Sequence, residues 1–216
     1  MSGPAGSRFT WVVRMTDLDL LALHGLAVKK AGTPESVADV LGAEPAAVGS
    51  ALEAHVAAGR AVGAKGKFMV AAAGRTWLDD RYPEVFAQLR SEEAATAAYE
   101  RFERVNRELL ALFTDWQTMP AGGERVPNDH SDADYDRSVI DRLGDLHERA
   151  DKVLARLAAL EERLSRYTAR LDDAYDKALA GETDYVSGVR VDSYHTVWFE
   201  LHEDLLRMLG RTREEQ

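Results

Sequence analysis

The chain has 216 residues, of which 45% are hydrophobic, and its 27 Lys and Arg against 37 Asp and Glu give a formal net charge of -10. This length and apolar content fit a globular protein with one large domain or two small ones, and we expect two. The chain contains no Cys, which excludes disulfides, cysteine nucleophiles and thiolate metal sites, so any metal would need His and carboxylate ligands.

The negative charge is concentrated in the C-terminal part. Residues 1–90 hold ten Lys and Arg against nine Asp and Glu, whereas residues 91–216 hold seventeen against twenty-eight. An acidic surface repels phosphate, so any DNA contact is expected within the first ninety residues. The chain contains no run of about 18 apolar residues, which a membrane-spanning helix would need. Residues 1–8 lack the apolar core of a signal peptide. We therefore expect a cytoplasmic protein with no membrane partner.

The first part of the chain predicts a tail, three helices and a hairpin. Residues 1–8 are mostly small, contain Gly, Pro and Ser, and are expected to be disordered, and residues 9–13 form a short apolar run. Helices are predicted over residues 17–31, 34–41 and 45–58, because apolar residues recur at helical spacing, Thr33 and Pro34 mark a start, and Gly32, Gly42 and Gly59 mark ends. Residues 60–64 and 68–72 then form two short strands around a turn at Gly66.

Three helices followed by a hairpin is the order of a winged helix-turn-helix, which we expect over residues 9–82. The motifs are Thr-Pro-Glu-Ser-Val-Ala-Asp-Val-Leu-Gly at 33–42, the helix at 48–59, and Gly-Lys-Phe-Met-Val at 66–70 running to Ala-Gly-Arg at 73–75. In these motifs, over roughly a third of its length, the chain resembles the MarR-like winged-helix proteins. The resemblance implies a DNA-binding transcriptional regulator.

The candidate DNA contacts lie in the hairpin rather than in the third helix. The expected outward residues of that helix, such as Glu44, Ser50 and Glu53, include no Arg, Lys, Asn or Gln that could pair with a base edge. Phosphate contacts are predicted instead from the hairpin, with shape reading by the third helix around Ser50; the cations are Arg60, Lys65, Lys67 and Arg75. The alternative is a solvated hairpin in a domain that serves only dimerisation or docking.

The C-terminal part predicts an antiparallel helical bundle over residues 83–216. Residues 77–82 link the two parts, a short helix covers 83–89, and a long helix starts at 91–93 and is broken by Pro120. Residues 121–129 are expected to be an irregular loop. A helix capped by Ser131 or Asp132 continues its apolar period as far as Leu171, either as one long antiparallel arm or as two helices bent near 149–152, with a further break near Ser165. Gly181 ends that run, and a last helix covers 192–209, capped by Asp192 or Ser193.

Three stretches of this part are similar to a group of actinobacterial proteins of unassigned activity, which join a MarR-like winged helix to a helical domain. The stretches are Thr-Asp-Trp-Gln at 114–117, Asn-Asp-His-Ser-Asp at 128–132 with Tyr-Asp at 135–136, and Asp-Ser-Tyr-His-Thr-Val-Trp-Phe-Glu-Leu-His-Glu at 192–203. This resemblance covers nearly the whole chain. It implies a regulator and brings no established reaction.

The last helix and the 128–132 loop concentrate the candidate site residues. His195 and His202 share one face of that helix, beside a broader apolar stripe; the stripe comprises Tyr194, Val197, Trp198, Leu201, Leu205 and Met208. If the bundle brings the loop against this helix, His130 could join both histidines near carboxylates, a donor set that binds zinc, iron or manganese. However, the i, i+7 histidines lie about 10 Å apart on an ideal helix, and the usual i, i+4 ligand pair is absent, so we name no metal or cofactor.

Three functions follow from these patterns. The first is a dimeric transcriptional regulator whose helical domain senses a small molecule in a pocket; its lining would be Trp116, Asn128, Asp129, His130, Tyr194, His195, Trp198 and His202. The second is an enzyme in which the winged helix no longer binds DNA; its acids, bases or ligands would be Asp129, His130, Asp132, His195 and His202. The third is a docking scaffold. Against all three, the aspartates could be helix caps and the histidines satisfied polar side chains.

Overall fold

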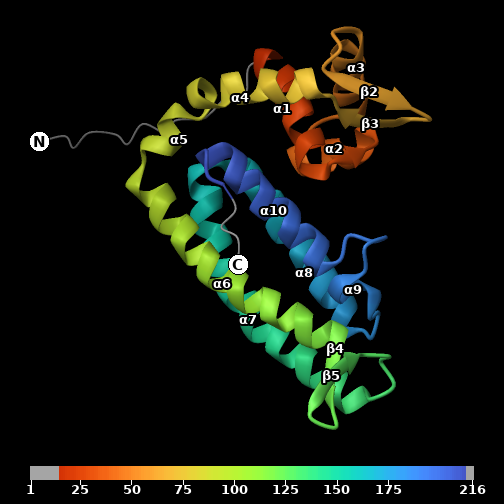
Figure 1. Cartoon of the computed structure of the whole chain (residues 1–216). Coiled ribbons are helices and arrows are strands. Elements are labelled where there is room, and N and C mark those ends of the chain that lie inside the picture. Colours follow the sequence, from red (N-terminus) through yellow and green to blue (C-terminus); the bar gives the residue numbers. More distant parts are fainter. Residues whose placement is uncertain (1–14, 213–216) are drawn as a thin grey trace, which may run out of the picture. The chain divides into compact units, whose positions relative to one another are not determined.

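The computed structural model describes residues 15–212, so the predicted tail at 1–8 and the apolar run at 9–13 lie outside the described residues. The protein is mostly helical with a small antiparallel sheet, which confirms the predicted mostly α class (Figure 1). It divides into two compact units. The N-terminal unit comprises the described residues up to Ala38 and Ala43–Leu78, and the helical unit comprises Asp39–Gly42 and the described residues from Asp79 onward. Among residues 15–212, no helix combines the length and apolar content that crossing a membrane requires.

The N-terminal unit builds its core from helices that begin and end near the predicted places. Its elements are α1 (Met15–Lys29), β1 (Ala31–Gly32), α2 (Pro34–Leu41), α3 (Pro45–Ala57), β2 (Ala61–Ala64), β3 (Lys67–Val70) and the start of α4 (Ala72–Val85). Thr33 caps α2, since its Oγ1 accepts from the backbone N of Ser36 at 3.3 Å while Ser36 Oγ accepts from the backbone N of Thr33 at 3.0 Å. This reciprocal arrangement satisfies amide groups that a helix start leaves free.

The sheet of the N-terminal unit has the strand order β1-β3-β2. Ala64 pairs with Lys67, so the β2-β3 connection has the two residues Lys65 and Gly66, at φ 51° and 74°. Two positive φ values give a turn whose twist suits a hairpin, and the predicted hairpin is confirmed. The prediction that the first helix reaches residue 31 is wrong. Lys30 leaves the helix at φ 64°, and Ala31–Gly32 pairs with β3 instead.

Residues 77–82, predicted to link the two parts of the chain, contain the boundary between the two units, which follows Leu78, and they are helical as part of α4 (Ala72–Val85). Leu78, Tyr82 and Phe86 follow one another at a spacing of four and are buried. That spacing places Leu78 and Tyr82 on one face of α4, and Phe86 follows directly after the helix. Pro83 lies within the last turn of this helix, where the loss of one amide donor interrupts little of the hydrogen-bond ladder.

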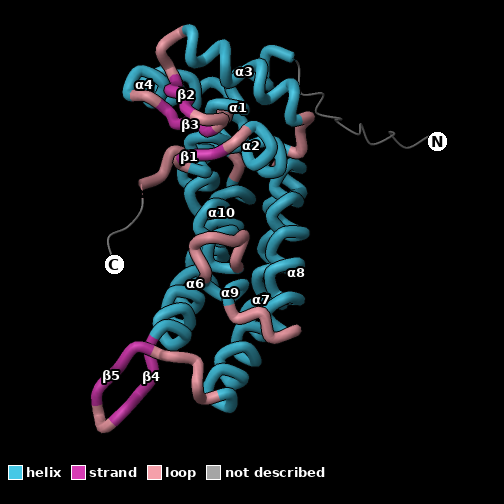
Figure 2. Tube along the Cα trace, turned by 90° about the vertical axis from the view of Figure 1, so that its right-hand side faces the viewer, coloured by secondary structure: helices cyan, strands magenta, loops and turns pink. Residues whose placement is uncertain are grey.

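The helical unit is formed by four longer helices with short elements between them. After the end of α4 come α5 (Ala87–Ser91), α6 (Glu93–Gln117), β4 (Thr118–Ala121), β5 (Glu124–Pro127), α7 (Ala133–Leu160), η1 (Glu162–Leu164), α8 (Ser165–Leu179), α9 (Asp184–Ser187) and α10 (Tyr194–Leu209). Helix α6 packs against α7, α7 against α8 and α8 against α10 (Figure 2). The rings of Phe102 on α6 and Trp198 on α10 stack with centroids 4.6 Å apart, so aromatic packing joins the first and last of these helices.

Several predictions for this unit are corrected and others are confirmed. The prediction of an irregular loop at 121–129 is wrong, because β4 and β5 form a hairpin around Gly122 and Gly123, whose φ angles are 60° and 91°. Helix α7 is helical throughout 149–152, so the prediction of a bend there is wrong. The predicted further break near Ser165 is confirmed, because α7 ends at Leu160 and α8 starts at Ser165. Two caps are confirmed as well: Asp132 accepts from two backbone amides of α7, and Ser193 accepts from the backbone N of Thr196 in α10.

Candidate functional site

The β2-β3 hairpin presents one face that is both apolar and cationic. Val62 pairs directly with Met69, and these side chains are 57% and 53% exposed. Lys67 lies two residues before Met69 on the same strand, so it points to the same side of the sheet, and Lys65 occupies the turn. Both lysines are exposed. We call Val62, Lys67 and Met69 the outer hairpin face.

The other predicted DNA contacts of this unit are already engaged within it. The Arg60 guanidinium lies over the Trp77 ring at 4.6 Å, and its Nη1 is 3.4 Å from His55 Nδ1. Arg75 Nη1 donates to the Val70 carbonyl at 3.4 Å, and Ser50 Oγ donates to the Ala46 carbonyl at 3.0 Å. These contacts hold the base of the hairpin and the surface of α3, which leaves Lys65 and Lys67 as the exposed cations of the described hairpin.

The surface of α3 offers little for reading bases. Its exposed positions carry small or acidic side chains, namely Pro45, Ala46, Ser50, Glu53, Ala54 and Ala57, with Glu44 just before the helix. The prediction of weak direct readout therefore agrees with the exposed surface, since base edges are read by longer donors such as Arg, Lys, Asn and Gln.

His130, the first of the predicted site histidines, lies in the helical unit and contacts the end of α6 and the start of α7. His130 Nδ1 lies 2.9 Å from Asp136 Oδ2 and its ring lies 4.6 Å from that of Trp116. Asn128 Nδ2 donates to the Trp116 carbonyl at 3.0 Å and to Asp136 Oδ1 at 2.8 Å. Asp129 Oδ1 accepts from the backbone N of Ser131, and hydrogen bonds from Ser131 lower the pKa of Asp129. This network connects the end of α6 to the first turn of α7.

The other two predicted histidines have different partners on α6. His202 Nε2 lies 2.8 Å from Glu103 Oε1 and 3.4 Å from Tyr99 Oη. Burial raises the pKa of Glu103, but hydrogen bonds from His202 and Tyr99 outweigh burial and hold that pKa below its usual range. His195 packs on Phe113 with ring centroids 4.6 Å apart. Within residues 15–212, none of the predicted histidines belongs to a group of side chains at metal-ligand spacing.

The pKa of His195 is lowered by its partial burial against Phe113, so the folded protein favours the neutral ring. The unfolded chain titrates near 6.5, which means that it binds more protons than the folded chain just below that pH. The contribution of His195 to the free energy of unfolding is therefore greatest above about pH 6.5. It falls as the pH decreases towards the lower pKa of the folded state. We expect His195→Phe to reduce this pH dependence, as measured by urea unfolding between pH 5 and 7. An unchanged slope, or an NMR titration of His195 at or above 6.5, would contradict the expectation.

The aromatic residues predicted to line a ligand pocket are packed in the core. Trp116, Tyr194 and Trp198 are buried. Trp198 Nε1 donates to Asn106 Oδ1 at 3.0 Å, which satisfies the indole in an apolar setting. The predicted apolar stripe of α10 is confirmed as buried throughout.

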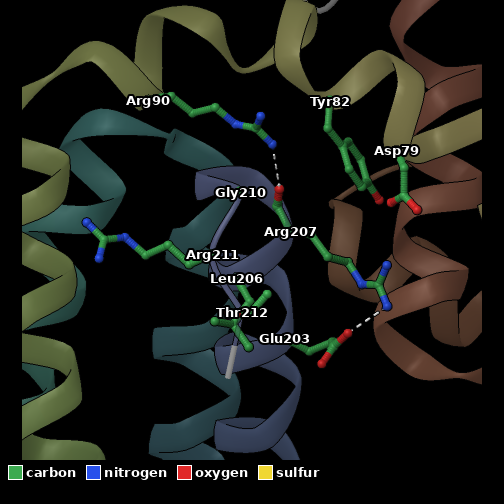
Figure 3. Close-up of a pocket in the computed structure, with 9 residues that line it drawn as sticks. All are labelled: Asp79, Tyr82, Arg90, Glu203, Leu206, Arg207, Gly210, Arg211 and Thr212. Atoms are coloured by element: carbon green, nitrogen blue, oxygen red, sulfur yellow. Dashed lines mark hydrogen bonds and ion pairs between the residues drawn. The ribbon is translucent and has the colours of Figure 1, made fainter. Parts of the chain in front are cut away.

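A cavity of about 480 Å³ lies instead at the C-terminal end of α10 (Figure 3). Arg207 Nη2 pairs with Glu203 Oε1 at 2.6 Å, and Arg90 donates to the carbonyls of Arg207 and Met208 at 3.1 and 2.8 Å. Burial raises the pKa of Tyr82 and keeps its hydroxyl protonated. The walls thus combine arginines, acids and a hydroxyl; the lining residues are Asp79, Tyr82, Arg90, Glu203, Leu206, Arg207, Gly210, Arg211 and Thr212.

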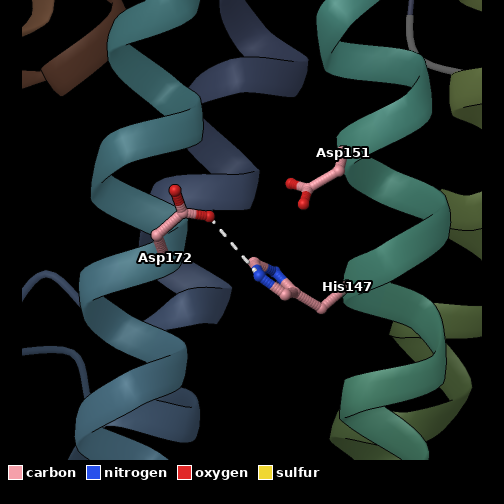
Figure 4. A group of neighbouring side chains, drawn as sticks. All are labelled: His147, Asp151 and Asp172. Atoms are coloured by element: carbon pink, nitrogen blue, oxygen red, sulfur yellow. Dashed lines mark ion pairs between the residues drawn. The ribbon is translucent and has the colours of Figure 1, made fainter.

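One polar cluster was missed at the sequence level. His147 and Asp151 on α7 face Asp172 on α8, and one ligand atom from each lies within 4.8 Å of the others (Figure 4). The available signal was the i, i+4 spacing of His147 and Asp151, which places both on one helical face. The third member is 21 residues away from Asp151 on another helix, and only the packing of α7 on α8 brings it close.

No protein-family model matches the chain, and neither a curated protein nor a solved structure matches it.

Proposed function

We propose that the protein is a DNA-binding transcriptional regulator of the winged helix-turn-helix class, whose helical bundle serves as its effector module. The observation that carries the proposal is the outer hairpin face, where an exposed aliphatic pair, Val62 and Met69, adjoins Lys67 and the Lys65 turn. The enzymatic alternative has less support, because His130, His195 and His202 each contact a different partner.

The hairpin suits the minor groove of DNA. Its lysines supply the charge that attracts phosphate, while exposed aliphatic side chains on one strand pair fit the apolar walls that sugars provide in that groove. On α3, alanines at exposed positions allow the backbone to approach closely, whereas Glu44 and Glu53 oppose phosphate. The expected mode is therefore phosphate contact by the hairpin combined with reading of DNA shape, and not hydrogen bonding to base edges.

We expect the double variant Lys65→Ala with Lys67→Ala to weaken DNA binding about tenfold at low salt. Because each lost phosphate contact changes the slope of log K against log salt by about 0.9, the slope should become shallower by about 2. Fluorescence anisotropy with a labelled duplex over a salt series measures both quantities.

The matched control removes the same charge from the helical unit. Lys152→Ala with Arg156→Ala changes two exposed cations of α7 and should leave the slope unchanged. An equal loss in both double variants would show that only the net charge matters. No measurable DNA affinity in the unmodified protein at low salt would remove the proposal itself.

The proposal extends to a homodimer and to a small molecule bound by the helical bundle. A winged-helix regulator usually reads two half-sites through two-fold symmetry, and light scattering of the full chain tests the dimer. The cavity at the end of α10 has a volume typical of metabolite sites, and its arginines favour an anionic ligand. Thermal shift with a panel of carboxylates and phosphates, followed by DNA binding, tests it; no shift with any compound would remove the sensing role.

A further inference from the structure

The cluster of His147, Asp151 and Asp172 lies where α7 packs on α8. His147 Nε2 is 3.4 Å from Asp172 Oδ1, and the Asp172 side chain is about half exposed, so the cluster is open to solvent on that side. Figure 4 shows His147 and Asp151 projecting from one helix towards Asp172 on the other. The arrangement thus gathers one imidazole and two carboxylates from two helices.

The cluster holds more negative charge than its described partners neutralise. Asp151 Oδ1 is buried and has no hydrogen-bond partner within residues 15–212. Burying a carboxylate oxygen in this way is costly, and such an oxygen in a native protein calls for an explanation. The second carboxylate, Asp172, faces the same space. A bound cation would supply the missing partner for Asp151 and offset the repulsion between the two aspartates.

The contacts of His147 favour the tautomer in which Nε2 carries the lone pair that a metal ion would bind. His147 Nδ1 lies 3.3 Å from the hydroxyl of Tyr194, a fully buried residue of α10, and the ring stacks on Tyr175 at 4.6 Å. In the tautomer with its proton on Nδ1, His147 donates to Tyr194 and directs the Nε2 lone pair towards the aspartates. A histidine that binds a metal through one nitrogen commonly donates from the other to such an outer partner.

We propose that His147 Nε2, Asp151 and Asp172 bind a divalent transition-metal ion, with Zn²⁺ as its probe. One imidazole and two carboxylates suit Zn²⁺ and related ions. Ligand atoms about 2.0–2.2 Å from one ion are at most about 4.4 Å apart, so the 4.8 Å spacing closes with side-chain movements of a few tenths of an ångström. Three protein ligands leave a position for water, and the ion links α7 to α8. This site is independent of DNA binding by the N-terminal unit.

The test uses the full, tag-free chain, stripped with a chelator and titrated with Zn²⁺ by calorimetry. We expect one ion per chain and a rise in melting temperature with added Zn²⁺. At a free concentration 100 times Kd, the equilibrium constant for unfolding should fall about 100-fold. No binding to the stripped protein, or binding that leaves its melting temperature unchanged, would overturn the proposal.

The decisive variant is Asp151→Asn, which keeps the shape of the side chain and removes its charge. Without metal, this variant should be at least as stable as the unmodified protein, because a charged carboxylate with one buried, unpartnered oxygen is gone. With Zn²⁺, it should bind at least tenfold more weakly and lose the thermal shift, and His147→Gln should lose the shift as well. Asp134→Asn, an exposed acid of the same helix, should bind like the unmodified protein. Equal Zn²⁺ affinity in Asp151→Asn and Asp134→Asn would refute this ligand set.

Discussion

Replacing Asp204 by alanine is expected to lower the free energy of unfolding of the helical unit by about 3–5 kcal/mol. The Asp204 side chain is fully buried and Arg163 is 7% exposed, and the two form a double hydrogen bond of 2.6 and 2.9 Å. Tyr167 Oη donates to the same carboxylate at 2.8 Å. Removing the carboxylate leaves a guanidinium and a hydroxyl buried without their acceptor, and that cost is much larger than the net value of the pair.

Burial and Asp204 act in opposite directions on the protonation of Arg163. Burial lowers the pKa of Arg163, but Asp204 outweighs burial and raises that pKa above its usual value. Burial also raises the pKa of Tyr167, so its hydroxyl stays protonated and donates. In the Asp204→Ala variant, burial acts on Arg163 without this compensation. A guanidinium is not deprotonated in proteins, so the variant keeps a positive charge in the interior, and relief has to come from local opening of the packing around Arg163.

Urea unfolding followed by circular dichroism measures the effect, with two comparisons. Glu108→Ala breaks an exposed double hydrogen bond to Arg149 and should cost less than about 1 kcal/mol. The triple variant Arg163→Met, Tyr167→Phe, Asp204→Leu replaces the whole group by apolar side chains and should recover most of the loss. Similar losses in Asp204→Ala and Glu108→Ala would mean that the buried pair is no more important than a surface pair.

The helices were predictable because their signals are local. Thr33 before Pro34, Asp132 before α7 and Ser193 before α10 are caps that act within three residues. The buried stripe of α10 follows from a period that the sequence displays directly. The β2-β3 hairpin belongs to the same class, because Gly66 between two short apolar runs specifies the turn.

The candidate sites were less predictable, because they depend on which helical faces meet. Arg163 and Asp204 are 41 residues apart, and nothing in either neighbourhood indicates the pairing. The prediction around His130 assumed that the 128–132 loop would meet α10, but hydrogen bonds fold that loop onto Trp116 and Asp136. The strand Ala31–Gly32 was missed for the same reason, since two residues carry no period and depend on β3 for their partners.

The second large effect is expected from Gly74→Ala in α4. A Cβ at this buried position would lie 2.1 Å from the Arg60 carbonyl oxygen and 2.9 Å from Val70 Cγ1. The Arg60 carbonyl cannot move freely, because it accepts from the backbone N of Ala71 at 2.9 Å while the Arg60 amide donates to the His55 carbonyl at 2.8 Å. The added methyl group must therefore displace α4 from the base of the hairpin.

Overpacking of this kind costs about 1–3 kcal/mol and more when the obstacle is backbone, so we expect a loss at or above the upper end of that range for the N-terminal unit. Gly49→Ala is the matched control. Gly49 lies inside α3, its added Cβ would only meet Pro34 atoms at 3.5 Å, and replacing a helical glycine should gain up to about 1 kcal/mol.

Thermal and urea unfolding of the two alanine variants should thus give changes of opposite sign. Gly74→Ala should also weaken DNA binding, because the displacement of α4 removes packing from the base of the hairpin that carries Lys65 and Lys67. If Gly74→Ala were as stable as Gly49→Ala, that result would contradict the close contact between α4 and the base of the hairpin. If it lost stability but kept full DNA affinity, DNA contact by Lys65 and Lys67 would not depend on the packing of α4 against the hairpin base.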